Sequence, residues 1–386
     1  MATDSFTETT STGWFGRIGS SIKGVLVGLV MIVISAVVLF WNEGRAVKTE
    51  RTLEEGAKGV VSISADAVDE GKQGKLVHLT GMAKATGELS DPVLGIKVEA
   101  LKLRRNVEMY QWKEESKSET RKKLGGGEET VTTYSYVKDW AGDFIDSSKF
   151  KNQAGHENPR LPMESEDWTA TPITVGAYTL SPGLAGQIGG FTTVRGDDAV
   201  ELPETVASKK LHRSVDGFYL GEDPAKPMVG DVRVSHEAAL PGDVSVIAKL
   251  RGSSFEPYLA KAGGSIEMLE NGNQSAEAMF ATAHAGNRML TWVLRAVGVL
   301  VMFIGFTSVF RPLSVLADVV PFVGNIVGVG TGLVSLLLTV PISLVIIGVA
   351  WIFYRPMIGI PLLLVAVVGF VLLIRKMLSQ KRLAAA

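Results

Sequence analysis

The residues that could carry chemistry in this chain are few and scattered. The histidines are His78, His156, His212, His236 and His284, and no two have the i, i+3 or i+4 spacing that places two metal ligands on one helix face. The chain has no cysteine, which excludes disulfides, iron–sulfur clusters and thiol catalysis. No phosphate-binding loop, dinucleotide fingerprint or G-x-S-x-G motif occurs. We therefore expect no catalytic residue, no cofactor and no metal site, in a protein that is not an enzyme.

Two charged residues stand within apolar sequence, where a charge needs either water or a partner. Arg295 lies inside the apolar stretch from Met289 to Phe310, and Asp318 is the only acidic residue after residue 288. The Arg295 guanidinium can extend to the membrane interface or bind an acceptor inside a helix bundle. Arg295 and Asp318 are expected near opposite membrane faces, so they would pair only if residues 312–330 re-enter the membrane. Both are candidate intramembrane charges.

The apolar sequence around these charges predicts a membrane protein. Charged residues make up 20% of the chain, and the mean hydropathy is +0.22. Residues 24–41, 296–310, 323–354 and 357–374 contain no charge, and about 20 apolar residues suffice to cross a bilayer as a helix. We predict four transmembrane helices, at residues 22–41, 289–310, 333–354 and 357–374. Residues 311–332 are predicted to be an interfacial or re-entrant segment.

The basic residues predict the orientation of these helices. With both termini in the cytoplasm, the cytoplasmic side carries Arg17, Lys23, Arg311, Arg375, Lys376, Lys381 and Arg382. The connection between the last two spans offers only Arg355 on the other side. The positive-inside rule therefore places residues 1–21 and 375–386 in the cytoplasm and residues 42–288 across the membrane. The first span is expected to stay uncleaved, because its exit at Phe40–Glu43 has no small-residue cleavage site.

Residues 42–288 are expected to form a large, acidic, β-rich domain. They show no basic stripe of the kind that binds nucleic acid. Apolar residues share one parity and polar residues the other between Leu101 and Met109, which predicts a half-buried strand. A second alternating run at residues 131–140 follows the glycines of residues 125–127, so a long hairpin of about 40 residues is predicted. The fold class is an α+β membrane protein with four transmembrane helices and a β-rich extracytoplasmic domain between the first and second.

Shorter segments complete this domain. Further strands are predicted at residues 60–64, 75–81, 230–238 and 243–252, whereas residues 155–165 and 204–214 are expected to be connections. Ser275, followed by alanine-rich sequence, predicts the start of a helix that leads into the second span. If that helix is unbroken, movement or assembly of the outer domain is mechanically tied to the membrane helix.

Five residues near the hairpin are candidates for interaction with a partner. They are Arg104, Arg105, Tyr134, Tyr136 and Trp140. Arg105 shares the parity of the apolar residues, so it either pairs with a carboxylate at a sheet margin or contacts a partner or ligand. The aromatic residues either pack inside the domain or form a face that buries against another subunit.

Several segments together resemble a known family. They are GRAVKTERTLEEG after the first span, KLVHLTG, LSDPVLGIKVEALKLRRNVEMYQWKE, GHENP, GDVRVS, TWVLRAVG and WIFYRP. In this order they resemble the transmembrane protein 43 family, also called LUMA, over most of the chain. The resemblance implies four spans and a large luminal or extracytoplasmic domain. It also implies a self-associating organiser of membrane protein complexes, which in animals lies in the endoplasmic reticulum and inner nuclear membrane with partners including emerin and lamins.

The lack of cysteine and the short termini favour a bacterial member, to which nuclear partners would not carry over. The expected location is the bacterial inner membrane, with residues 42–288 on the periplasmic side, or the endoplasmic reticulum or nuclear envelope in a eukaryote. We expect a self-associating membrane scaffold or sensor in contact with membrane lipid and with other membrane or extracytoplasmic proteins, and not with nucleic acid. The alternative is an oligomeric channel or transporter, in which the glycine-rich residues 323–332, Pro341 and the two charges line a path.

Overall fold

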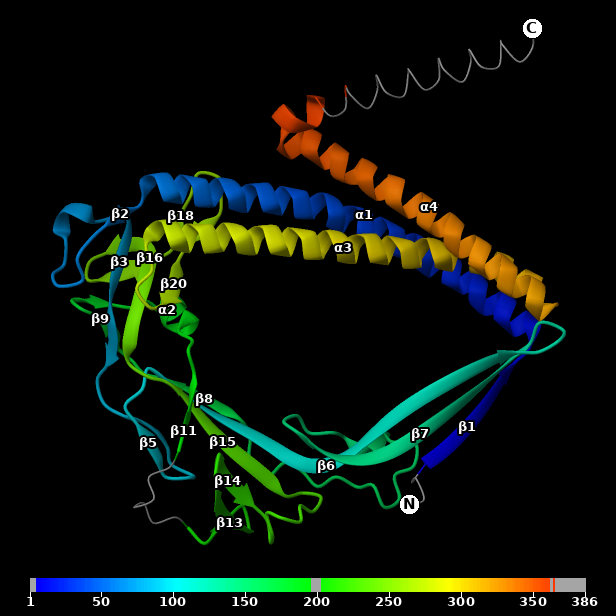
Figure 1. The fold of residues 1–386 in the computed structure, drawn as a ribbon, viewed down its shortest axis with the longest axis horizontal. Coiled ribbons are helices and arrows are strands. Elements are labelled where there is room, and N and C mark those ends of the chain that lie inside the picture. The colour runs from blue at the N-terminus through cyan, green and yellow to red at the C-terminus, as the bar shows by residue number, and fades with distance from the viewer. Residues whose placement is uncertain (1–4, 196–202, 362–363, 365–386) are drawn as a thin grey trace. The chain divides into compact units, whose positions relative to one another are not determined.

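The computed structural model describes residues 5–195, 203–361 and 364, and the chain divides into two compact units. The β unit comprises Met1–Thr9, Thr52–Glu119 and Val131–Thr282. The helical unit comprises Thr10–Arg51, Thr120–Thr130 and Ala283–Ala386. The helices are α1 (Trp14–Gly59), α2 (Pro182–Gln187), α3 (Ala276–Ala317) and α4 (Pro321–Tyr354) (Figure 1).

A seven-stranded sheet forms a closed ring in the β unit. Its strands are β2 (Val61–Ser62), β3 (Leu76–Ala85), β9 (Ile173–Val175), β10 (Tyr178–Thr179), β16 (Gly242–Arg251), β17 (Ser254–Glu256) and β20 (Met268–Asn271). The order is β2-β3-β9-β10-β17-β16-β20, and an additional pairing of β3 with β16 closes the ring. Apolar residues of one parity, among them Val77, Leu79 and Val246, are buried in its core. Three of the shorter predicted strands, at residues 60–64, 75–81 and 243–252, are confirmed in this sheet, and the fourth, at residues 230–238, corresponds to β15 (Val232–Ala239) of the other large sheet.

A nine-stranded sheet carries the long hairpin. Its strands are β1 (Ser5–Thr12), β6 (Lys102–Lys122), β7 (Glu128–Ala141), β8 (Glu166–Thr169), β11 (Thr192–Val194), β12 (Thr205–Val206), β13 (Lys209–Ser214), β14 (Gly217–Leu220) and β15 (Val232–Ala239). The main order is β1-β7-β6-β15-β14-β13-β12, with β11 beside β15 and β8 beside β6. Leu103, Val107 and Met109 are buried in a second core, so the predicted strand parity is confirmed. Two small pairs, β4 (Leu89–Asp91) with β5 (Ile96–Val98) and β18 (Tyr258–Leu259) with β19 (Ser265–Ile266), complete the unit.

The helical unit contains three helices that are long and apolar enough to cross a membrane, counted among the described residues. They are α1, α3 and α4, which run side by side (Figure 1). Small residues let α1 and α3 approach closely: a Cβ on Gly28 would lie 2.6 Å from the Gly305 carbonyl oxygen, and Ser35 Oγ donates to the Gly298 carbonyl at 2.6 Å. Such contacts are how helices associate in lipid, where hydrophobicity alone gives no preference. The first three predicted spans therefore lie within these helices.

Two features of the predicted topology are corrected by the structure. Residues 311–332 are not a separate re-entrant segment, because α3 continues through Pro312 to Ala317 and α4 begins at Pro321. Proline needs no hydrogen-bond acceptor at a helix start, so Pro321 begins α4 instead of ending a helix. Residues 5–12 form β1 and pair with β7, so a membrane cannot separate this N-terminal segment from the hairpin. Most of the predicted fourth span, residues 357–374, lies outside the described residues.

Candidate functional site

The three helices of the helical unit meet at a buried carboxylate. The Glu43 side chain, from α1, is 2% exposed and accepts hydrogen bonds from Arg295 Nε at 2.6 Å and Arg295 Nη2 at 2.8 Å. Trp351 Nε1, from α4, donates to the same carboxylate at 2.8 Å. The Arg295 guanidinium also lies 4.8 Å from the centre of the Trp292 ring. Glu43 therefore joins α1, α3 and α4 through one bidentate ion pair and one indole hydrogen bond.

Further polar side chains extend this network along α1 and α3. Asn42 Nδ2 donates to the Thr291 carbonyl at 3.0 Å, and Asn287 Nδ2 donates to the Ala46 carbonyl at 3.0 Å. Arg45 reaches both Asn287 Oδ1, at 3.0 Å, and Thr291 Oγ1, at 2.9 Å. These contacts fix the rotation of α1 relative to α3, because each hydrogen bond joins a specific residue of one helix to a specific residue of the other.

The network decides between the two roles open to Arg295. The side chain is 17% exposed and has an acceptor within the bundle, so it does not simply extend to the interface. Sequence reasoning did not select Glu43, Asn42 or Trp351 as a site. The available signal was the change from apolar residues to Asn42 and Glu43 at the end of the first span, which gives no information about a partner 252 residues away.

A second charge cluster surrounds Asp318 at the junction of α3 and α4. The Asp318 side chain is 1% exposed, and its Oδ2 accepts from Arg17 Nη2 of α1 at 2.5 Å. Its Oδ1 accepts from Lys122 Nζ at 2.7 Å, and Lys122 also donates to Asn325 Oδ1 at 2.9 Å. Arg17 forms a further ion pair with Glu128 at 3.0 Å. Lys122 and Glu128 belong to the ends of β6 and β7, so Asp318 fastens the hairpin tip to the helices.

Glycine is required at the centre of this tip. Gly126 has φ of +80°, and its carbonyl oxygen accepts a hydrogen bond from Arg17 Nη1 at 2.6 Å. A Cβ at Gly126 would lie 2.3 Å from the Trp14 ring, which itself donates from Nε1 to the Val315 carbonyl. The run of glycines predicted as a hairpin tip thus permits both the turn and the close approach to α1. Arg295 and Asp318 do not pair with each other, since each has its own partners.

The β unit holds a buried ionic cluster around Asp91. Arg105 Nη1 donates to Asp91 Oδ1 at 2.9 Å, and His236 Nε2 donates to Oδ2 at 2.9 Å, with Asp91 and His236 fully buried. Arg105 also pairs with Glu166 at 3.1 Å and lies over the Trp168 ring. Burial by itself would raise the pKa of the Asp91 carboxyl, but the hydrogen bonds from His236 and Arg105 and the Arg105 charge hold this pKa below its ordinary value.

The other predicted interaction residues have partners within the β unit. Arg104 pairs with Asp167 at 2.7 Å. Tyr136 is 6% exposed, stacks on His156 and donates to Glu114 at 2.8 Å. Trp140 packs against Tyr110 and Tyr219, and Tyr134 lies near Phe6. These contacts favour packing within the domain over an exposed aromatic face, most clearly for Tyr136.

The chain is similar to known sequences along most of its length. The family model described as "Transmembrane protein 43" matches residues 109–356. Transmembrane protein 43 of Rattus norvegicus is 36% identical over 358 residues, which cover 89% of this chain and 88% of the rat protein. The chain belongs to the transmembrane protein 43 family. The human protein is 36% identical over 359 residues, covering 89% and 88%, and the homolog of Drosophila melanogaster is 32% identical over 368 residues, covering 93% and 96%. No solved structure matches this chain.

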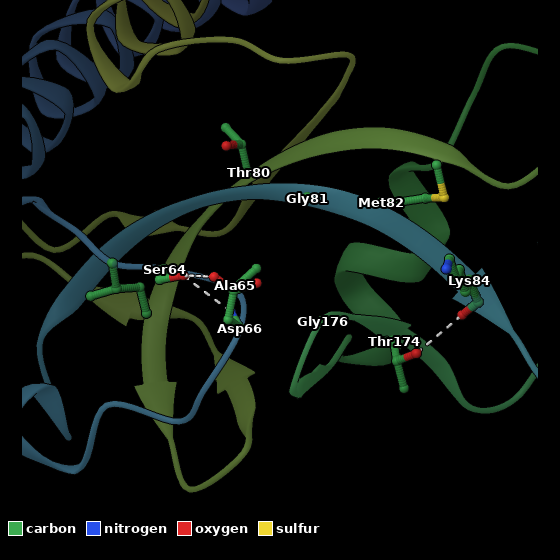
Figure 2. Close-up of a pocket in the computed structure, with 10 residues that line it drawn as sticks. Ser64, Ala65, Asp66, Thr80, Gly81, Met82, Lys84, Thr174 and Gly176 are labelled. Carbon is green, nitrogen blue, oxygen red and sulfur yellow. Dashed lines mark hydrogen bonds between the residues drawn. The ribbon is translucent and has the colours of Figure 1, made fainter.

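This transmembrane protein 43 family member also has an open polar pocket of about 480 Å³ in its β unit (Figure 2). On one edge of β3 the pairing with β2 ends at His78 and the pairing with β9 begins at Ala83, and the pocket occupies the gap. Ser64 Oγ donates to Asp66 at 2.7 Å in this pocket. The lining has no histidine to act as a base for that hydroxyl, so the arrangement supports binding better than nucleophilic catalysis. Among the described residues, no group of three or more acidic or histidine side chains could hold a metal ion.

Proposed function

We propose that this family member is a non-enzymatic, self-associating membrane scaffold or sensor that organises protein complexes through its β unit. One observation carries the proposal: α1 and α3 each run as one unbroken helix from residues of one unit into residues of the other. Helix α1 contains Trp41 of the helical unit and Leu53 of the β unit, and α3 contains Phe280 of the β unit and Arg295 of the helical unit. A continuous helix transmits rotation or displacement along its axis, which is what a sensor of assembly requires.

The Glu43 network supports this coupling. A displacement of α1 or α3 is communicated to α4 because Glu43 binds Arg295 and Trp351 together. A bundle without such cross-links would absorb the displacement by sliding of its apolar surfaces. The polar contacts therefore make the helices respond as one body.

The alternative, an oligomeric channel or transporter, has weaker support. This alternative was motivated by the glycine-rich residues 323–332, by Pro341 and by charge within the membrane. Both charges have partners within a single chain: Arg295 binds Glu43, and Asp318 binds Arg17 and Lys122. A neutralised ion pair attracts permeating ions less than a free charge does.

We also propose that the ring of β3, β9, β10, β17 and β16 lies on the extracytoplasmic side, as the basic residues that flank the spans favour. This proposal covers the ring alone; the hairpin tip contacts Trp14 and Arg17 of α1. The proposed partners of the β unit are a second copy of the chain and other membrane or extracytoplasmic proteins.

The test uses the full chain in mild detergent, with particle mass measured by light scattering over a wide concentration range. We expect a mass above that of one chain which falls on dilution, and a strictly monomeric particle at every concentration would refute self-association. Coupling is tested by inserting four glycines into both connecting helices, between Arg51 and Thr52 of α1 and between Thr282 and Ala283 of α3, with one such insertion after the exposed Gly87 as the control. Assembly should slow hydrogen exchange in residues 289–310 of the parent and of the control, but not of the chain with both helix insertions. Equal slowing in all three chains would contradict the coupling.

A further inference from the structure

An apolar groove of about 470 Å³ runs between α1 and α4 in the helical unit. Ala36, Val37 and Trp41 line it from α1, and Val345, Val349 and Tyr354 line it from α4. Val37 is 62% exposed and Trp41 is 56% exposed. On helices that cross a membrane, a groove of this composition is open to acyl chains instead of water.

The α1 wall of the groove continues into basic residues. Its lining residues Val37 and Trp41 are followed at spacings of three and four by Gly44, Lys48 and Arg51. Residues at this spacing share one face of a helix. The Tyr354 ring lies against Gly44, where a Cβ would be 2.6 Å from the ring, so the groove and the basic residues are consecutive on the same face.

Arg51 marks the polar end of the groove. Its Nη2 donates to the carbonyl oxygen of Tyr354, a lining residue, at 3.0 Å. Among the described residues no carboxylate lies within ion-pair distance of Arg51, whereas the neighbouring Glu50 is paired with Arg355. The next carboxylate toward the N-terminus, Glu43, is bound by Arg295. The end of the groove therefore carries exposed positive charge, beyond the aromatic rings of Trp41 and Tyr354, which are of the kind found at membrane interfaces.

We propose that the groove binds one acyl chain of an acidic glycerophospholipid, whose phosphate is held by Arg51 and Lys48. The apolar groove accounts for the chain, and the charge accounts for the choice of headgroup. A zwitterionic lipid offers the same acyl chain and phosphate, but its ammonium group opposes the positive charge at the groove end. Arginine suits the phosphate because its N–H groups can donate to two phosphate oxygens together.

The test measures quenching of Trp41 fluorescence by brominated lipids in vesicles of unlabelled phosphatidylcholine. The Trp41 contribution is the difference between the parent and Trp41→Phe. We expect brominated phosphatidylglycerol to quench this contribution at a lower mole fraction than brominated phosphatidylcholine, by about fivefold for each basic residue that contacts the headgroup. Arg51→Gln should lower the preference about fivefold, and Lys48→Gln with Arg51→Gln should remove it. Arg311→Gln, which removes an exposed cation elsewhere in the helical unit, is the matched control and should leave the preference unchanged.

The acyl part of the site is tested by filling the groove. Ala36→Phe should reduce quenching of Trp41 by both lipids, whereas Val27→Phe, at an exposed α1 position outside the groove, should not. Helicity and elution volume show whether each variant is folded. Val349→Phe tests the same point from α4 if Ala36→Phe is misfolded.

Three results would overturn the proposal. The first is an equal response of Trp41 to the two brominated lipids, and the second is a preference that survives in the double variant. The third is occupancy of the groove by the chain's own apolar residues 357–374. Because the chain has no cysteine, a disulfide between Val37→Cys and single cysteines placed along residues 365–374 reports this directly. Rapid, complete disulfide formation would show that this segment fills the groove in place of lipid.

Discussion

Replacement of Arg295 by methionine should destabilise the helical unit strongly, although arginine is an unfavourable residue in an apolar helix. In the parent, Arg295 supplies two of the three hydrogen bonds to Glu43, at 2.6 Å and 2.8 Å. Without it, a carboxylate that is 2% exposed keeps only the Trp351 indole donor. The loss of one partner from a buried ion pair costs about 3–5 kcal/mol, because the remaining charge stays desolvated.

A double variant tests whether the loss of stability comes from the unpaired charge on Glu43. Glu43→Leu together with Arg295→Met removes both charges and leaves only the Trp351 N–H without its acceptor. A buried unsatisfied donor costs about 1–3 kcal/mol. The double variant should therefore be more stable than Arg295→Met alone, since replacement of a buried ion pair by apolar residues is commonly neutral or stabilising.

The assay is unfolding in mixed micelles of dodecyl maltoside and sodium dodecyl sulfate, followed by far-ultraviolet circular dichroism. Arg311→Met removes an exposed arginine from the same helix and is the matched control, expected to change the free energy of unfolding by under about 0.5 kcal/mol. The reasoning is refuted if Arg295→Met costs as little as Arg311→Met. It is also refuted if the double variant is less stable than either single variant.

Three further predictions follow from other parts of the molecule. Single cysteines at Leu124 and Ser11 should react with a membrane-impermeant maleimide from the same side of the membrane, because β1 pairs with β7 and the hairpin tip contacts α1. Labelling of the two positions from opposite sides would contradict the structure. The folded-state pKa of Asp91 is lowered, so its stabilisation is present above the ordinary carboxyl pKa of about 4 and is lost as the pH falls toward the folded value. The thermal midpoint of the β unit should fall over this acidic range, less steeply in Asp91→Asn, and equal slopes would count against the role of Asp91. Tyr136→Ser should cost about 3–5 kcal/mol and make the β unit protease-sensitive, whereas Tyr134→Ser should cost less; a stable Tyr136→Ser chain that fails to assemble would instead support an aromatic interface.

Local patterns in the sequence were sufficient for most individual elements. The alternation from Leu101 to Met109 identified β6, and the helix expected from Ser275 into the second span is α3. The same reasoning failed for residues 204–214, expected to be a connection. These residues form β12 and β13, joined through Ala207 and Ser208 at φ of 51° and 64°. Neither residue is one that favours positive φ, so the turn gave no signal.

The long-range pairs could not be found in this way. Glu43 and Arg295 are 252 residues apart, and Arg17 and Asp318 are 301 residues apart. Each charge is visible in the sequence, but every carboxylate of the chain is an equal candidate for each arginine until the helices are placed side by side. For the same reason β1 was missed: its alternating threonines acquire a role only once β7 offers a hydrogen-bonding edge.

The sequence by itself determined that the chain is a membrane protein with a large β-rich part, because hydropathy over some twenty residues and side-chain parity along a strand are local properties. It also determined the family, through short segments kept in order. Only the tertiary structure decided that Arg295 and Trp351 both bind Glu43 and that Asp318 holds the hairpin tip. It also decided that Arg105 and His236 both bind Asp91. The physical reason is that burying a charge is favourable only with a partner at hydrogen-bonding distance, and that distance is set by how helices and strands pack, not by their own sequences.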